Sequence, residues 1–227
     1  MTRLVTYLCL LVFLFVGCGI TPSIEKATAP LLFEPVIVEK EIVPLKKDDI
    51  HKIIREFWEP DAKIFIFTKS KEDFRLFGGI QIKDTLYELG DVGEYTYLDQ
   101  LDMKTSSLFQ QPVTEIGGFC GADCAFRYYV AIKDNTPSIL LYLNAIPHVI
   151  DVDQDGTEEI IASYGSPGAY ETVMYTFLDN QVVSVDLNKQ LNAKNVLYTD
   201  SVFQVQKKSE DPPQKYKYGK ESLILSD

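Results

Sequence analysis

The sequence predicts a mainly β fold, an antiparallel meander with one helix near its start. Short runs of β-branched and aromatic residues alternate with turn residues, which is typical of hairpin-connected strands. Of the 227 residues 46% are hydrophobic and 12% aromatic, enough for one well-filled core and unlike disordered or collagenous chains. Such a meander could form a sandwich or part of a propeller. An α+β fold is the alternative.

Nine segments after Pro60 have the composition of strands. They are residues 63–68, 76–82, 126–132, 138–144, 147–152, 158–164, 171–177, 181–187 and 202–207. The turns between them carry Asp-Asn-Thr-Pro at 134–137, Asp155-Gly156 and Asp179-Asn180, all of which favour hairpins. Residues 95–118 have no clear pattern, and we expect a surface loop or a short helix at 99–109.

One helix is expected before these strands. Its apolar residues Ile50, Ile53, Ile54 and Phe57 fall at the i, i+3, i+4 and i+7 positions that share one helical face. Asp48 or Asp49 can cap its first turn, and Pro60 can end it.

The N-terminus has the pattern of an export signal. Arg3 precedes an apolar run from Leu4 to Val16, which ends in Gly17-Cys18. The run is shorter than the roughly 20 residues of a spanning helix. We therefore assign residues 1–17 to a signal peptide.

The end of this run, Phe15-Val16-Gly17-Cys18, resembles the lipobox of bacterial lipoproteins. The resemblance implies cleavage before Cys18, lipid attachment to that cysteine, and a location on the cell membrane or the outer membrane. Phe15 departs from the aliphatic residue that the family prefers. An ordinary secretory signal is the alternative.

Residues 18–47 are expected to form a lipid-anchored tether before a globular domain at 48–227. Four prolines punctuate this stretch, and proline-rich chain favours the extended polyproline conformation. The alternative is that Val36, Ile37 and Val38 form an edge strand of the domain, since β-branched residues are not typical of linkers.

Charge and cysteine content narrow the classes of partner. The formal net charge of −11 disfavours nucleic acid, because phosphate binding needs clustered Lys and Arg. Outside the cytoplasm, Cys120 and Cys124 are expected to form a disulfide. The alternative is a redox or copper site, because the CxxxC pair is similar to the motif of Sco-type proteins, with His148 as a third ligand. Gly121 replaces that family's proline.

The segment Asp151 to Glu159 has the spacing of a calcium loop. Ca²⁺ takes six to eight oxygen ligands, and this loop offers carboxylates at alternate positions and a backbone carbonyl. The candidate ligands are Asp151, Asp153, Asp155, the Thr157 carbonyl and Glu159. An EF-hand is excluded, because Ala162 stands where its bidentate Glu is required. The alternative is a hairpin turn with solvated acidic residues.

Residues 151–168, DVDQDGTEEIIASYGSPG, resemble the calcium loop of FG-GAP or VCBS-type repeats. The resemblance puts Asp151, Asp153, Asp155, Thr157 and Glu159 on the family's metal positions and implies a structural Ca²⁺. It covers one copy only, whereas a complete propeller needs roughly four to eight blades.

These observations favour a surface-anchored module that binds an envelope protein or glycan over an enzyme. The chain has two histidines and no GxSxG elbow, so a Ser-His-Asp triad has little material. The sequence predicts no catalytic residue.

Overall fold

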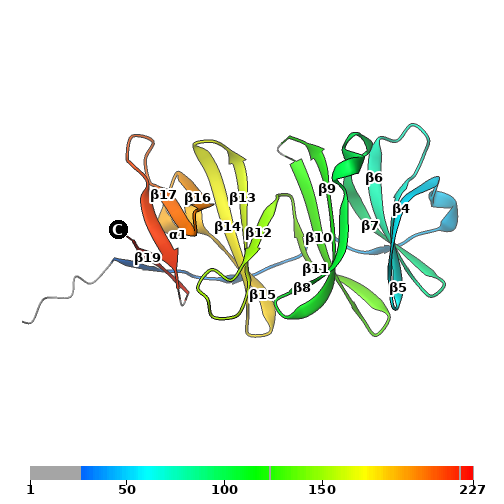
Figure 1. The fold of residues 1–227 in the computed structure, drawn as a ribbon, viewed down its shortest axis with the longest axis horizontal. Coiled ribbons are helices and arrows are strands. Elements are labelled where there is room, and N and C mark those ends of the chain that lie inside the picture. Colours follow the sequence, from blue (N-terminus) through cyan, green and yellow to red (C-terminus); the bar gives the residue numbers. More distant parts are fainter. Residues whose placement is uncertain (1–26, 123, 220, 227) are drawn as a thin grey trace, which may run out of the picture.

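The computed structural model describes residues 27–122, 124–219 and 221–226, and these form four antiparallel sheets standing in a row (Figure 1). Each sheet contains a meander of four consecutive strands, and three of the sheets add a fifth, short strand from the start of the chain. We number them sheet I (β4–β7), sheet II (β8–β11), sheet III (β12–β15) and sheet IV (β16–β19). The expected mainly β meander is confirmed. Sheets I and IV lie at opposite ends of the row, so the described residues form an open array (Figure 1).

The first two sheets come from the first part of the chain. Sheet I consists of β4 (Lys52–Glu59), β5 (Ala62–Thr68), β6 (Arg75–Ile82) and β7 (Thr85–Glu94), preceded by the 3₁₀ turn η1 (Lys47–Asp49). The 3₁₀ segment η2 (Tyr95–Gln100) leads to sheet II, which consists of β8 (Asp102–Leu108), β9 (Gln111–Gly121), β10 (Cys124–Lys133) and β11 (Thr136–Leu143).

The second half of the chain repeats this organisation. Sheet III consists of β12 (Pro147–Ile150), β13 (Glu159–Ser166), β14 (Ala169–Leu178) and β15 (Gln181–Asp186). The short helix α1 (Leu187–Leu191) leads to sheet IV, which consists of β16 (Asn195–Thr199), β17 (Val202–Gln206), β18 (Gln214–Tyr218) and β19 (Ser222–Leu225).

Several hairpins close through two residues with left-handed backbone. The pairs Asp134-Asn135 and Asp179-Asn180 have φ between 49° and 64°, as do Phe109-Gln110 and Asp200-Ser201. This backbone matches the right-handed twist of the paired strands, and Asp and Asn tolerate it well. The expected hairpin turns at 134–137 and at Asp179-Asn180 are confirmed.

The helix expected at the start of the domain is wrong, because residues 52–59 form strand β4. The strand pairs with β5 along its length, with a bulge between Ile53 and Arg55. Ile54 and Phe57 pack on the core, whereas Ile53 is exposed, so the predicted helical face does not form a single buried stripe. β-branched residues favour a strand where a buried partner is available, and that pairing overrides the helical spacing.

The loop or short helix expected at 99–109 is also wrong over most of its length. Residues 95–100 form η2, and residues 102–108 form strand β8 paired with β9. The sequence of β8, DMKTSSL, is largely polar, because most of its side chains are exposed or only partly buried in this edge strand. Polar composition therefore concealed a strand.

Part of the stretch expected as a tether belongs to the folded domain. Three short strands, β1 (Thr28–Pro30), β2 (Glu34–Pro35) and β3 (Val43–Pro44), pair with β19, β15 and β7 respectively. Between β2 and β3, the Lys40 ammonium lies 5.1 Å from the ring centre of Tyr142 on β11. Residues 28–44 therefore form a strap along the row, touching all four sheets (Figure 1).

Facing sheets bury their side chains against each other. One apolar cluster lies between sheets I and II, a second between II and III, and a third between III and IV. Successive residues of one strand serve different clusters, since side chains alternate across a sheet. Tyr128 contributes to the first cluster and Tyr129 to the second, while Ile160 contributes to the second and Ile161 to the third.

The helices of the described residues are all short. Among 27–122, 124–219 and 221–226, none is long and apolar enough to span a bilayer.

Gly118 allows sheets I and II to approach closely. A Cβ at this position on β9 would collide with the carbonyl oxygen of Val92 on β7 and with the side chain of Leu101. We predict that Gly118→Ala lowers the free energy of unfolding by about 1–3 kcal/mol, the usual cost of overpacking. Gly219→Ala is the control, because its Cβ would meet only Ile224 at an ordinary 3.9 Å. Equal denaturation midpoints for the two variants would contradict this account.

Candidate metal centre

The candidate calcium loop joins two paired strands of sheet III. β12 and β13 are antiparallel, with Val149 opposite Ile160 and Ile150 opposite Glu159. This register brings Asp151, which directly follows β12, close to Glu159, which begins β13. Residues 151–158 then close the hairpin, so the first and last candidate ligands are placed by the strand ladder.

Backbone amides inside the loop fix its curled shape. The Asp151 carboxylate accepts hydrogen bonds from the amides of Asp155 at 3.1 Å and Gly156 at 2.9 Å. The Asp155 carboxylate accepts one from the Thr157 amide at 2.7 Å. Gly156 has φ of +92°, and a Cβ there would meet nothing within 4 Å. Its left-handed backbone, rather than lack of space, therefore favours glycine.

Three of the five predicted ligands converge. Asp151, Asp153 and Glu159 each offer a carboxylate oxygen, and these oxygens lie within 4.8 Å of one another. Two oxygens bound to one Ca²⁺ at 2.3–2.6 Å are separated by at most about 5.2 Å. The three carboxylates are therefore close enough to share a single calcium ion.

The other two predicted ligands lie beside this group. Asp155 is exposed, and the converging group found among the described residues does not include it. Asp155 and Thr157 line a cleft next to the loop, as Asp153 and Glu159 also do. The group of three carboxylates is accordingly smaller than the set that the spacing predicted.

Glu159 is the buried member of the group, with 3% of its surface exposed. Burial, together with the negative charges of Asp153, Asp155 and Asp151, raises the pKa of its carboxyl to about 7. The Val152 amide donates a hydrogen bond at 3.0 Å to Glu159 Oε2 and opposes this shift. A divalent cation would stabilise the ionised form of this carboxylate and reduce the repulsion among its neighbours.

A tyrosine from sheet IV completes the surroundings of the loop. Burial raises the pKa of Tyr218, and the charges of Glu159 and Asp153 raise it further. Sequence reasoning missed Tyr218, because it is 59 residues beyond Glu159 and only the packing of sheet IV on sheet III brings it close.

The cleft next to the loop has a volume of about 620 Å³, within the usual range of small-molecule sites. It lies where sheets III and IV meet, and its walls combine the acidic loop with apolar groups of both sheets. Its lining includes Asp153, Asp155, Glu159, Phe177, Tyr218 and Ile224. A bound cation would therefore lie at the wall of an accessible cleft.

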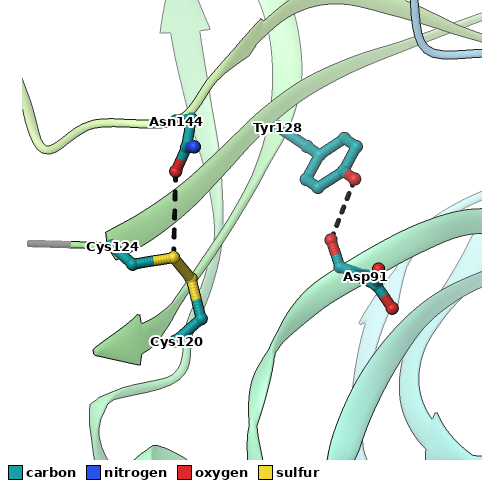
Figure 2. Close-up of a disulfide and its surroundings, with 5 residues drawn as sticks. All are labelled: Asp91, Cys120, Cys124, Tyr128 and Asn144. Atoms are coloured by element: carbon teal, nitrogen blue, oxygen red, sulfur yellow. Dashed lines mark hydrogen bonds between the residues drawn. A yellow bond between two sulfur atoms is a disulfide. The ribbon is translucent and has the colours of Figure 1, made fainter.

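The cysteine pair lies at the far end of a hairpin in sheet II. Cys120 near the end of β9 and Cys124 at the start of β10 form a disulfide, with their Cα atoms 5.0 Å apart (Figure 2). Asn144 lies beside it, with Oδ1 4.0 Å from Cys124 Sγ. The bridge closes the β9–β10 hairpin.

The histidine considered as a copper ligand has a different neighbour. His148 on β12 packs on Tyr198 of sheet IV, with ring centres 6.1 Å apart. Among the residues that the structure describes, the carboxylates of Asp151, Asp153 and Glu159 are the group with metal-site spacing, and it contains neither the cysteines nor His148. The proposed lipid attachment at Cys18 lies outside the described residues.

Comparison with protein-family models, with curated proteins and with solved structures finds no match to this chain. The role of the loop is therefore inferred from its own residues and their geometry.

The raised pKa of Glu159 predicts a pH-dependent stability for the metal-free protein. Its folded pKa of about 7 exceeds the ordinary 4.5, so the folded state binds more protons than the unfolded state between these values. With a chelator present to keep the protein metal-free, the free energy of unfolding should fall as pH rises from about 4.5 to 7 and then level off. Urea titrations across this range measure it. Glu159→Gln should flatten the fall, and an unchanged slope would contradict the assignment.

Proposed function

We propose that this chain is an exported lipoprotein, anchored through Cys18, whose β domain binds a protein or glycan of the cell envelope and is stabilised by Ca²⁺. The proposal of a bound cation rests on one observation: carboxylate oxygens of Asp151, Asp153 and Glu159 lie within 4.8 Å of one another. The ion would brace the β12–β13 hairpin, and the role is binding rather than catalysis.

Three features support a calcium ion in preference to a solvated acidic turn. The ligand oxygens fit the span of one Ca²⁺. Glu159 is buried, and an ionised buried carboxylate is costly unless it is paired or bound to a metal. Backbone amides hold Asp151 in place before any ion binds, which reduces the ordering required on binding.

The strap limits the reach of the proposed anchor. β1 begins at Thr28 on the edge of sheet IV, ten positions beyond Cys18. Ten residues of fully extended chain reach at most about 36 Å. A protein held by lipid on Cys18 would therefore keep the β1 edge of sheet IV within about that distance of the membrane.

Calcium should raise the thermal stability of the protein. At a hundred times its Kd the ion contributes about 2.7 kcal/mol, which for a chain of this size raises Tm by roughly 5–10 °C. We predict that Asp153→Asn loses most of this rise, because it removes one charge from the group of three. Differential scanning fluorimetry with millimolar Ca²⁺ or with chelator measures the effect.

Asp134→Asn is the matched control, since it removes one carboxylate from an exposed hairpin turn of sheet II and leaves a residue that tolerates the same backbone. It should keep the full rise. A wild-type melting curve that is the same with Ca²⁺ and with chelator would refute the proposal that the loop binds calcium.

The anchor is tested by Cys18→Ser. Without the acylated thiol the protein should move from the membrane fraction to the soluble fraction, because triple acylation supplies roughly 0.8 kcal/mol for every buried methylene. Fractionation followed by mass spectrometry of the N-terminal peptide measures the change. A Cys18→Ser protein that stays on membranes would count against lipid attachment.

A further inference from the structure

A second cleft lies where sheets II and III meet, away from the cleft that the acidic loop shares with sheet IV. Its volume is about 400 Å³, which suits a small molecule. Most of its lining is polar or charged, unlike a site for an apolar ligand. The lining includes Asp102, Lys104, Glu115, Arg127, Tyr129 and Glu158.

The strand register of sheet II assembles its charged part. Lys104 of β8 lies opposite Glu115 of β9, which lies opposite Tyr129 of β10. The neighbouring row consists of Asp102, Gly117 and Arg127 on the same three strands. The cleft is thus built on rigid strands, which position side chains more precisely than loops do.

The charges in these rows already compensate one another. Arg127 Nη1 lies 3.2 Å from Glu115 Oε1 and 3.6 Å from Asp102 Oδ2. Lys104 Nζ lies 3.3 Å from Asp102 Oδ2 and 3.4 Å from Glu115 Oε2. Two cations and two anions form a closed network, and Glu158 adds one further negative charge at the rim. A ligand need not bring a charge of its own.

Gly117 lets the arginine lie flat on the sheet. A Cβ at this position would collide with the Arg127 guanidinium, which therefore crosses β9 above the glycine. The guanidinium is mostly buried there, with 11% of the side-chain surface exposed. Its position is fixed by packing as well as by its ion pairs.

Two polar atoms at the cleft have no hydrogen-bond partner among the described residues. They are the Tyr129 hydroxyl and Arg127 Nε. Tyr129 is only 1% exposed. A buried polar group without a partner costs free energy, so native proteins seldom leave two together. Both side chains line the same cleft, so a ligand whose polar groups reach these two atoms would satisfy both.

We propose that this cleft binds a neutral saccharide. Each sugar hydroxyl can accept a hydrogen bond from the Tyr129 hydroxyl or Arg127 Nε and donate one to Glu115 or Asp102. A carboxylate or phosphate ligand would instead face Asp102, Glu115 and Glu158. The proposal rests on the proposed binding role and names its ligand class, but it does not require the cation.

The adjacent tyrosines of β10 provide a matched pair of variants. The Tyr128 hydroxyl faces sheet I and donates a hydrogen bond of 2.9 Å to the Asp91 carbonyl (Figure 2). Tyr129 lies on the opposite face, and its hydroxyl has no described partner. Removing one hydroxyl at a time with Tyr128→Phe and Tyr129→Phe therefore separates stability from binding.

The probe is an array of immobilised neutral mono- and disaccharides to which the protein is applied. A sugar that captures the protein is then titrated into the full mature chain by calorimetry. We expect Tyr129→Phe to weaken binding about fivefold, the equivalent of one hydrogen bond. Its Tm should equal or exceed that of the wild type, because the variant loses a buried hydroxyl that has no partner among the described residues. Tyr128→Phe should lower Tm and leave the Kd unchanged. The cation is tested separately by the melting curves with Ca²⁺ and with chelator. If the protein binds the sugar but shows no calcium-dependent rise in Tm, the saccharide site is supported and the calcium site is refuted.

Three results would overturn the saccharide site. The first is that no neutral sugar on the array captures the protein. The second is equal affinity of the wild type and Tyr129→Phe for a retained sugar, which would place the sugar elsewhere. The third is a fall in Tm for Tyr129→Phe as large as for Tyr128→Phe, which would show that this hydroxyl has a structural partner.

Discussion

Each inner sheet of this protein has to bury both of its faces, and this requirement shapes the rest of the molecule. Sheets II and III lie between neighbours, so their strands carry apolar residues at consecutive positions instead of alternate ones. Tyr128 and Tyr129 are adjacent yet each is at most 1% exposed, and so are Ile160 and Ile161. The row depends on these double-sided strands, because apolar burial is the main force holding separate sheets together.

An open row leaves sheet edges that invite pairing with other chains, and the strap covers part of them. β1, β2 and β3 each contribute two or three residues to the edges of β19, β15 and β7. Each of these strands contains a proline, which lacks an amide hydrogen and suits an outer edge. A proline-rich segment therefore gives edge protection that a regular long strand would not.

The sequence predicted the elements whose signal is local. β5 contains a continuous apolar run and β14 is rich in β-branched and aromatic residues. The Asp179-Asn180 turn favours left-handed backbone by its residue types. β4 was misread because Ile50, Ile53, Ile54 and Phe57 also fit a helical face, and only pairing with β5 decides between them. β8 and the strap strands are polar or proline-bearing, and their partners are far away in the chain.

The same distinction applies to the two clefts. The acidic loop was visible in the sequence because its candidate ligands lie within nine residues. Tyr218 reaches that loop only through the packing of sheet IV on sheet III, and the charged rows of sheet II form only when its strands pair. The clefts are nevertheless linked through sheet III. Glu158 lines the cleft toward sheet II, and Glu159, the next residue, lines the cleft toward sheet IV. β12 contributes Pro147 and Val149 to the cleft between sheets II and III. An ion that braces the β12–β13 hairpin would therefore also stiffen one wall of the proposed saccharide site.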